Sequence, residues 1–180
     1  MNDTRDAELA GYRRLLGELR LQLDVLSTID PITGLLNRNG ILDAVDAAAA
    51  RQGRTSEPFG MLLVALPHLG RIRAVYGDIV YADHLRDVGA LLSAALRDMD
   101  TVGRIDECSF LAVLPWVGED ALPELRLRLE RVLRSRDDRL VPEFTHVFAG
   151  PYGRADADDL LALLAAAPAT VGGSGPHDGA

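Results

Sequence analysis

Gly60-Met61-Leu62-Leu63-Val64-Ala65-Leu66 is an unbroken apolar run in the first half of the chain. A polar loop at residues 52–58 ends one residue before it. A strand with one face in water alternates apolar and polar side chains, whereas a strand covered on both faces stays apolar throughout. We therefore predict that residues 60–66 form a strand at the centre of a sheet, covered on both faces.

The segments around this strand show helical and strand patterns in turn. Apolar spacing of three and four residues predicts helices at residues 39–51, 69–75, 79–97, 119–134 and 156–167. Further strands are predicted at residues 101–105, 110–114 and 143–149. The first two form a hairpin about a tight acidic turn, Asp106-Glu107. Helices mixed with one mainly antiparallel sheet define the α+β class.

The two ends of the chain differ from this domain. Near the N-terminus, apolar residues occupy heptad positions a and d: Leu9, Tyr12, Leu16, Leu19, Leu23 and Leu26. We expect residues 1–28 to form a coiled-coil helix that makes the protein a homodimer, and the alternative is one amphipathic helix packed on its own domain. The domain then spans residues 29–168, and the Gly-rich residues 169–180 are expected to be a flexible tail.

Charge and composition exclude several classes of function. A net charge of −8 and a pI of about 4.9 disfavour non-specific binding to nucleic acid or to an anionic membrane, because both need a basic face. An anionic ligand would have to be held by a local arginine cluster. All 19 basic residues are arginine, which excludes Schiff-base chemistry by a lysine. Cys108 is the single cysteine, and no signal peptide or membrane-spanning run is visible, so we expect a cytoplasmic protein.

Three segments, at residues 30–38, 62–85 and 104–115, resemble motifs of the GGDEF family of diguanylate cyclases in their order and separations. The first, Asp30-Pro31-Ile32-Thr33-Gly34-Leu35-Leu36-Asn37-Arg38, matches the family's DxLTGLxNR motif and is the most specific signal in the chain. The second, residues 62–85, keeps Tyr76-Gly77 and the apolar framework of LDxDxFKxINDxxGHxxGDxxL but not its polar letters. The third stands where the family has RxGGDEFxxxLP and keeps Arg104, Phe110, Leu114 and Pro115.

This resemblance covers residues 29–167 and implies the palm-like fold of nucleotidyl cyclases. That fold has a central, mainly antiparallel sheet of about five strands with flanking helices.

The chemistry of the family is expected to be absent. Joining two GTP molecules into cyclic di-GMP requires two divalent ions held by carboxylates. Where the resemblance places the metal-binding aspartate, this chain has Ala65, and Pro67 takes the neighbouring acidic position. Cys108 and Ser109 replace the acidic pair of the hairpin, and a neutral thiol is a poor magnesium ligand. We therefore predict no catalytic residue, no metal site and no cofactor, so that the chain is not an enzyme.

The family's substrate contacts are changed as well. Asp106 and Glu107 replace the two hairpin glycines and place negative charge where a triphosphate would lie. The guanine-recognising Asn and Asp correspond to Arg73 and Ala82, although an alignment shift of one residue restores Asp83. Asp106 and Glu107 are either displaced metal ligands or, as we expect, part of a solvated polar turn.

One binding site of the family is retained in sequence. Arg97-Asp98-Met99-Asp100 is an RxxD motif at the offset from the hairpin where active members carry an inhibitory site for a cyclic di-GMP dimer. Arg128 lies where the family supplies a second arginine from the next helix, with Arg126 as the alternative. An arginine grips phosphate or the O6/N7 edge of guanine, and a carboxylate accepts from guanine N–H groups. The competing interpretation is a solvated ion pair at a helix end.

These observations lead to three hypotheses. The first is a catalytically inactive regulator that senses cyclic di-GMP through Arg97, Asp100 and Arg128. The second is a protein-interaction module without nucleotide binding, which pairs with another signalling protein. The third, disfavoured by the missing metal carboxylate, is a residual GTP-binding or nucleotidyl-transfer enzyme.

Overall fold

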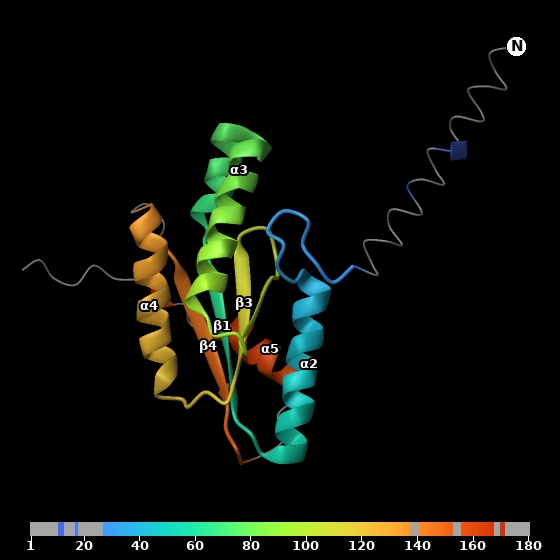
Figure 1. The fold of residues 1–180 in the computed structure, drawn as a ribbon, viewed down its shortest axis with the longest axis vertical. Coiled ribbons are helices and arrows are strands. Elements are labelled where there is room, and N and C mark those ends of the chain that lie inside the picture. Colours follow the sequence, from blue (N-terminus) through green and yellow to red (C-terminus); the bar gives the residue numbers. More distant parts are fainter. Residues whose placement is uncertain are drawn as a thin grey trace, which may run out of the picture.

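The structure, a computed structural model, describes residues 11–12, 17, 27–137, 141–152, 156–167 and 170–171. The coiled coil predicted at residues 1–28 lies almost entirely outside the described residues, as does most of the predicted tail. The domain between them is described nearly throughout (Figure 1). None of the described helices is both long enough and apolar enough to cross a membrane.

The described elements agree with the predicted order. They are α2 (Arg38–Thr55), β1 (Phe59–Ala65), α3 (His68–Ala95), β2 (Thr101–Arg104), β3 (Ser109–Pro115), α4 (Ala121–Arg136), β4 (Glu143–Ala149), α5 (Ala157–Ala166) and β5 (Thr170–Val171). The helices predicted at residues 69–75 and 79–97 are the two parts of α3, which changes direction at Gly77. Gly77 has φ 84° and ψ 178°, a backbone conformation that a residue with a Cβ rarely adopts.

The strands form one sheet in the order β2-β3-β1-β4-β5. Its ladders are antiparallel, and β1 lies in the middle, paired with β3 on one side and β4 on the other. Strands β1 to β4 have four to seven residues each, whereas β5 is a two-residue strand at the edge, inside the segment expected to be a tail. The predicted α+β class with a mainly antiparallel sheet is confirmed.

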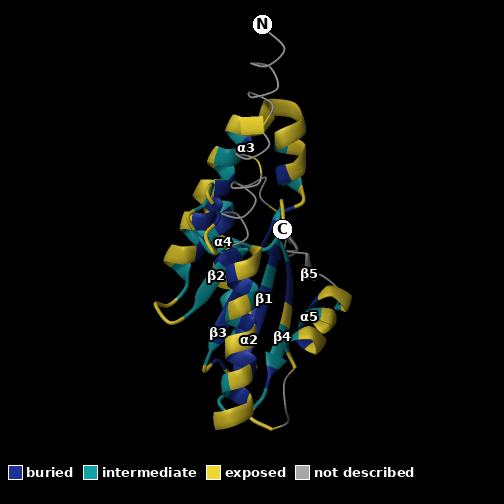
Figure 2. Ribbon diagram, turned by 90° about the vertical axis from the view of Figure 1, so that its right-hand side faces the viewer, coloured by how far each residue is buried: buried dark blue, intermediate teal, exposed yellow. Residues whose placement is uncertain are grey.

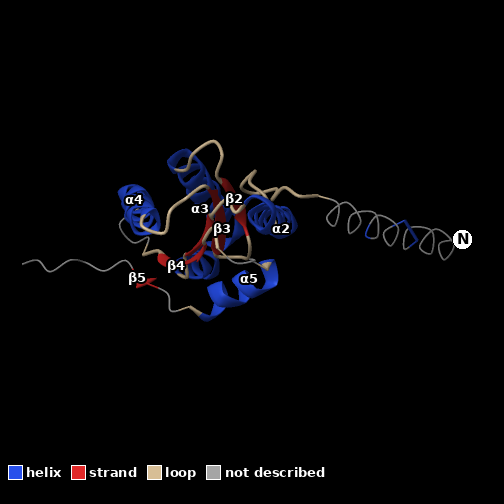
Figure 3. Cartoon of the chain, turned by 90° about the horizontal axis from the view of Figure 1, so that it is seen from below, coloured by secondary structure: helices blue, strands red, loops and turns tan. Residues whose placement is uncertain are grey.

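Helices cover both faces of the sheet, α3 and α4 on one face and α2 and α5 on the other (Figure 3). Successive residues of a strand point to opposite faces. Leu62 and Val64 of β1 accordingly join the core beneath α3 and α4, whereas Met61 joins the core beneath α2 and α5. The central strands β1 and β3 are therefore mostly buried, while the outer sides of the helices are exposed (Figure 2).

The opening motif, residues 30–38, ties the start of the domain to β2. Asp30 accepts hydrogen bonds from the backbone N–H and the hydroxyl of Thr33, both at 2.8 Å. Its other oxygen accepts from Nη1 of Arg104 at 3.0 Å. Asn37 caps α2, because its side-chain oxygen accepts from the Gly40 N–H at 3.0 Å. This motif thus fixes a turn, starts a helix and holds the hairpin strand that carries Arg104.

Candidate functional site

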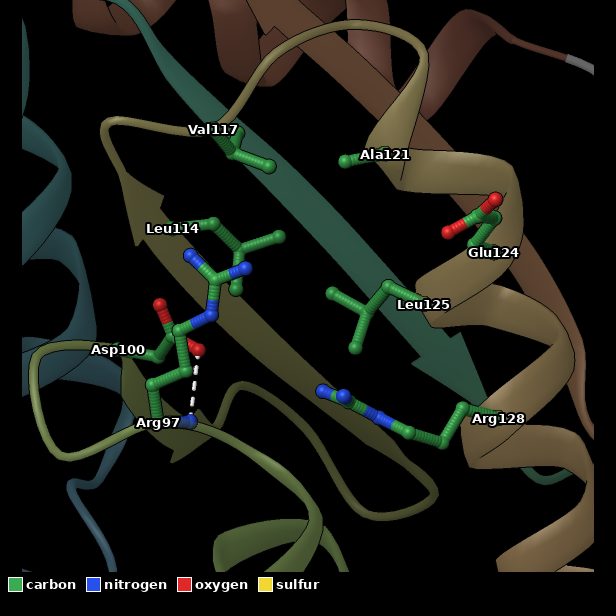
Figure 4. A pocket seen from close by; sticks show the side chains of 8 residues that line it. All are labelled: Arg97, Asp100, Leu114, Val117, Ala121, Glu124, Leu125 and Arg128. Carbon is green, nitrogen blue, oxygen red and sulfur yellow. Dashed lines mark hydrogen bonds between the residues drawn. The ribbon is translucent and has the colours of Figure 1, made fainter.

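The fold brings the three residues predicted to bind cyclic di-GMP to one cavity of about 190 Å³. Arg97 and Asp100 lie in the turn between α3 and β2, and Arg128 lies on α4 (Figure 4). They meet because α3 and α4 pack side by side on the same face of the sheet. Arg126, the alternative to Arg128, does not line this cavity and lies 3.7 Å from Glu130 in an ion pair.

Apolar side chains form the floor of the cavity between the charged groups. Leu114 comes from the end of β3, and Leu125 comes from the first half of α4 (Figure 4). Val117 and Ala121 complete this apolar surface, and Glu124 stands beside it on α4. The cavity therefore combines an apolar surface with two guanidinium groups and two carboxylates.

Asp100 has a structural role in the turn that carries Arg97. Its Oδ2 accepts from the Arg97 backbone N–H at 2.8 Å, and its own N–H donates to the Arg97 carbonyl at 2.9 Å. This arrangement closes the turn between α3 and β2. It also agrees with a purely structural reason for this sequence, in which arginine ends a helix and aspartate closes the following turn. The carboxylate's other oxygen, Oδ1, is not used in this contact.

The guanidinium groups of Arg97 and Arg128 are available to a ligand. Both residues are exposed, and within the part of the chain that the structure describes neither forms an ion pair. The solvated Arg97–Asp100 side-chain ion pair considered from the sequence is thus not formed, since Asp100 bonds the Arg97 backbone instead. Guanidinium groups without a carboxylate partner can donate to phosphate oxygens or to guanine O6 and N7.

The second region of interest is the place where β1 meets the hairpin. The family that this sequence resembles has its metal ligands there. Ala65 of β1 is directly opposite Ser109 of β3, and the Leu66 N–H donates to the Cys108 carbonyl at 2.8 Å. These positions are adjacent in space but supply no carboxylate. Burial raises the pKa of the Cys108 thiol, and the nearby Asp106 and Glu107 carboxylates raise it further, so the neutral thiol predominates at neutral pH.

The acidic residues of the hairpin turn are engaged with the protein itself. Asp106 Oδ1 accepts from the Cys108 N–H at 2.8 Å, which closes the turn. Glu107 Oε1 accepts from Nη1 of Arg73 at 2.8 Å, and Arg73 also donates to Asp78 at 2.7 Å. Among the described residues, no group of three or more His, Cys, Asp or Glu side chains is arranged to hold a metal ion. The residues present here do not fit the pair of divalent ions that the family's reaction uses.

Tyr81 fills the space between α3 and the hairpin turn. It is 4% exposed, and its hydroxyl donates to the Glu107 carbonyl at 2.5 Å and accepts from Nη2 of Arg104 at 3.0 Å. The Arg73 guanidinium lies over its ring, 5.3 Å from the ring centre. Burial raises the pKa of Tyr81, so the hydroxyl stays neutral and remains a donor. These contacts join α3, the hairpin and, through Arg104, Asp30.

The sequence over residues 27–145 matches the family described as "Diguanylate cyclase, GGDEF domain". The chain belongs to the GGDEF family. It is 26% identical to diguanylate cyclase DgcP of Pseudomonas aeruginosa over 104 residues, 58% of this chain and 16% of that protein. It is also 26% identical to the cyclic di-GMP phosphodiesterase PdeR of Escherichia coli over 113 residues, 63% of this chain and 17% of that protein. The chain thus spans about a sixth of the length of these relatives.

Solved GGDEF structures share the fold at low sequence identity. The GGDEF domain of DgcB from Caulobacter crescentus in complex with c-di-GMP has a TM-score of 0.70 and 14% identity, covering 78% of this chain and 86% of that one. The LapD S helix-GGDEF-EAL protein of Vibrio cholerae, bound to c-di-GMP, has a TM-score of 0.68 and 16% identity, covering 84% and 36%. The SiaD cyclase of Pseudomonas aeruginosa, in complex with its activator SiaC, has a TM-score of 0.69 and 18% identity, covering 90% and 65%. At such identities the likeness establishes the fold alone.

Two residues of this GGDEF domain that are prominent in the structure, Glu124 and Tyr81, were not predicted from the sequence. Glu124 lines the cavity together with Arg128. The two residues are four positions apart on a predicted helix, and this spacing indicates that their side chains share one face. Tyr81 occupies the position of a glycine in the family motif GHxxGDxxL when Gly77 is aligned with the first glycine. A large aromatic residue in place of a glycine indicates that its side chain fills the space between α3 and the hairpin turn.

Proposed function

We propose that this protein is a catalytically inactive GGDEF-like regulator that binds cyclic di-GMP through Arg97, Asp100 and Arg128. The observation that carries the proposal is the convergence of these side chains, from two separate parts of the chain, on one cavity. There, neither guanidinium group has a carboxylate partner among the residues that the structure describes. If Arg97 and Asp100 had no ligand to bind, their side chains would be expected to form an ion pair with each other. The proposal also places the protein in the cytoplasm, as a homodimer with its coiled coil at residues 1–28.

The absence of catalysis is supported by the site where the family holds its metal ions. Ala65 and Ser109 face each other across the strand pair, and neither offers a carboxylate. The Tyr81 ring and the Arg73–Glu107 ion pair occupy the space between α3 and the hairpin. A nucleotide entering there would have to displace these contacts and approach the negative charges of Asp106 and Glu107. This combination supports a receptor in preference to a residual GTP-binding enzyme.

Cyclic di-GMP is the ligand named for the Caulobacter DgcB and Vibrio LapD structures that share this fold. The cavity in this chain suits the same chemistry, because guanidinium and carboxylate groups flank an apolar surface on which a base can lie.

The proposal is tested by calorimetric titration of the protein with cyclic di-GMP and, separately, with GTP and magnesium. Cyclic di-GMP should bind, and Arg97→Ala should weaken binding by about 10- to 100-fold, corresponding to the loss of one bidentate contact. Arg71→Ala is the matched control, since Arg71 is exposed but belongs to a different cavity on α3. No heat with cyclic di-GMP at about 100 μM, confirmed by an unchanged melting temperature, would reject the receptor.

A protein-interaction module is the second candidate because of exposed apolar residues at the bend of α3 around Gly77. Val75, Tyr76 and Ile79 are 70%, 64% and 81% exposed, next to a cavity of about 360 Å³ lined partly by Val75 and Tyr76. Clustered exposed apolar side chains of this kind are typical of protein interfaces. If the wild type binds no cyclic di-GMP, and Ile79→Ser abolishes self-association measured by light scattering, this candidate replaces the receptor.

A further inference from the structure

Glu124 lies on the wall of the cavity opposite Arg97 and Asp100. It is four residues before Arg128 on α4, so the two side chains share one face of the helix. Figure 4 shows the Glu124 carboxylate beside the apolar floor, across the cavity from the Arg97–Asp100 turn. Within the described chain it forms neither an ion pair nor a hydrogen bond through its carboxylate, even with Arg128.

The presence of this carboxylate is unexpected in a site that only grips phosphate. A negative side chain facing a phosphate is repulsive, and the repulsion is stronger where water is excluded. Arg97 and Arg128 are the cationic groups of the cavity, and Asp100 and Glu124 balance them. A cavity with this charge pattern suits a group that both accepts and donates hydrogen bonds.

Glu124 also supplies acceptor capacity that Asp100 has partly lost. Asp100 uses Oδ2 to hold the backbone N–H of Arg97, which leaves it one oxygen for a ligand. Both oxygens of Glu124 are available. A guanine base presents N1–H and N2–H on one edge and O6 and N7 on another, so it can meet a carboxylate and an arginine at once.

The size of the cavity favours a single base. At about 190 Å³ it is smaller than the pockets of roughly 300–1,000 Å³ that enclose drug-sized ligands. A flat base can lie on Leu114 and Leu125 between the two walls, while the sugar and phosphate groups of the ligand remain at the surface near the arginines.

We propose that Glu124 is a specificity-determining residue that accepts the N1–H and N2–H groups of a guanine in cyclic di-GMP. This inference rests on the proposed function, because it concerns the same cavity. It implies discrimination against adenine, which has an acceptor at N1 and no amino group at C2. The corresponding adenine dinucleotide would therefore place a lone pair against the carboxylate.

The test is calorimetric titration of Glu124→Gln with cyclic di-GMP, cyclic di-AMP and inorganic pyrophosphate. We expect affinity for cyclic di-GMP to fall about tenfold and the preference over cyclic di-AMP to narrow, because the amide offers one acceptor oxygen and no charge. Affinity for pyrophosphate should stay the same or rise, because a repulsive charge is removed. Glu119→Gln is the matched control, since Glu119 is exposed just before α4 and does not line the cavity.

The outcomes separate this inference from the proposed function. Unchanged or tighter binding of cyclic di-GMP by Glu124→Gln would overturn the role of Glu124 in recognising guanine. If Arg97→Ala still weakened binding in that case, the proposed receptor function would be retained. Absence of wild-type binding would overturn both. Glu124 is exposed and glutamine has a similar helix propensity, so the variant should fold, and its melting temperature checks this.

Discussion

Replacing Asp30 by alanine removes the centre of the opening motif. The Asp30 and Arg104 side chains are only 11% and 13% exposed, and their ion pair is 3.0 Å long. The substitution also removes both hydrogen bonds from Thr33. Breaking a buried ion pair by removing one partner costs about 3–5 kcal/mol, and each hydrogen bond to a charged group contributes about 1.5–3 kcal/mol. Because these costs overlap and the pair keeps some exposure, we expect a loss of about 3 kcal/mol in the free energy of unfolding.

Urea unfolding followed by circular dichroism measures this loss. Asp43→Ala, at an exposed position of α2, is the matched control and should change stability by less than about 0.5 kcal/mol. In a double-mutant cycle with Arg104→Leu, the two losses should be strongly non-additive, because the groups share one interaction. A loss below about 1 kcal/mol for Asp30→Ala, with an additive cycle, would refute the structural role assigned to the motif.

Three other predictions concern pH, catalysis and assembly. Burial lowers the pKa of His68 below its ordinary value of about 6.5, with Arg71 adding to the effect, so the unfolded chain takes up this proton first as the pH falls. The free energy of unfolding should therefore fall as the pH drops below about 6.5, until the folded-state pKa is passed. His68→Leu should make the free energy of unfolding depend less steeply on pH in this range. The same pH dependence in both proteins would contradict the role of His68. The protein should make no cyclic di-GMP from GTP with magnesium or manganese, and Ala65→Asp alone should not restore synthesis, because Ser109 still lacks a carboxylate; product above a boiled control would show otherwise. A chain beginning at Ser27 should associate more weakly in light scattering, and an unchanged dimer would place the interface on the domain.

Most of the fold was predictable because its signals are local. The apolar run at residues 60–66 identified the buried central strand, and the Tyr76-Gly77 pair marked the change of direction within α3. The opening motif was identified by its sequence letters, whereas its turn, its helix cap and the Asp30–Arg104 ion pair were seen in the structure. Strand β5 was not predicted, because a two-residue strand depends on pairing with β4 and has no periodicity of its own.

The candidate site was only partly predictable. The RxxD spacing identified Arg97 and Asp100, and the family pattern selected Arg128. Glu124 and the apolar floor required knowledge of how α4 packs beside the α3–β2 turn, which no local pattern specifies. Asp106 and Glu107 are exposed, as expected of a solvated polar turn. The Arg73–Glu107 ion pair joins residues 34 positions apart, so no local pattern could predict it.

The most direct test of the central claim is to locate cyclic di-GMP on the protein by nuclear magnetic resonance. The side-chain Nε–H signals of arginine can be followed in nitrogen-15-labelled protein as the ligand is added. We expect the signals of Arg97 and Arg128 to shift and those of Arg71 and Arg73 to stay unchanged. Shifts centred on Arg73 and the hairpin, or no shifts at saturating ligand, would contradict it.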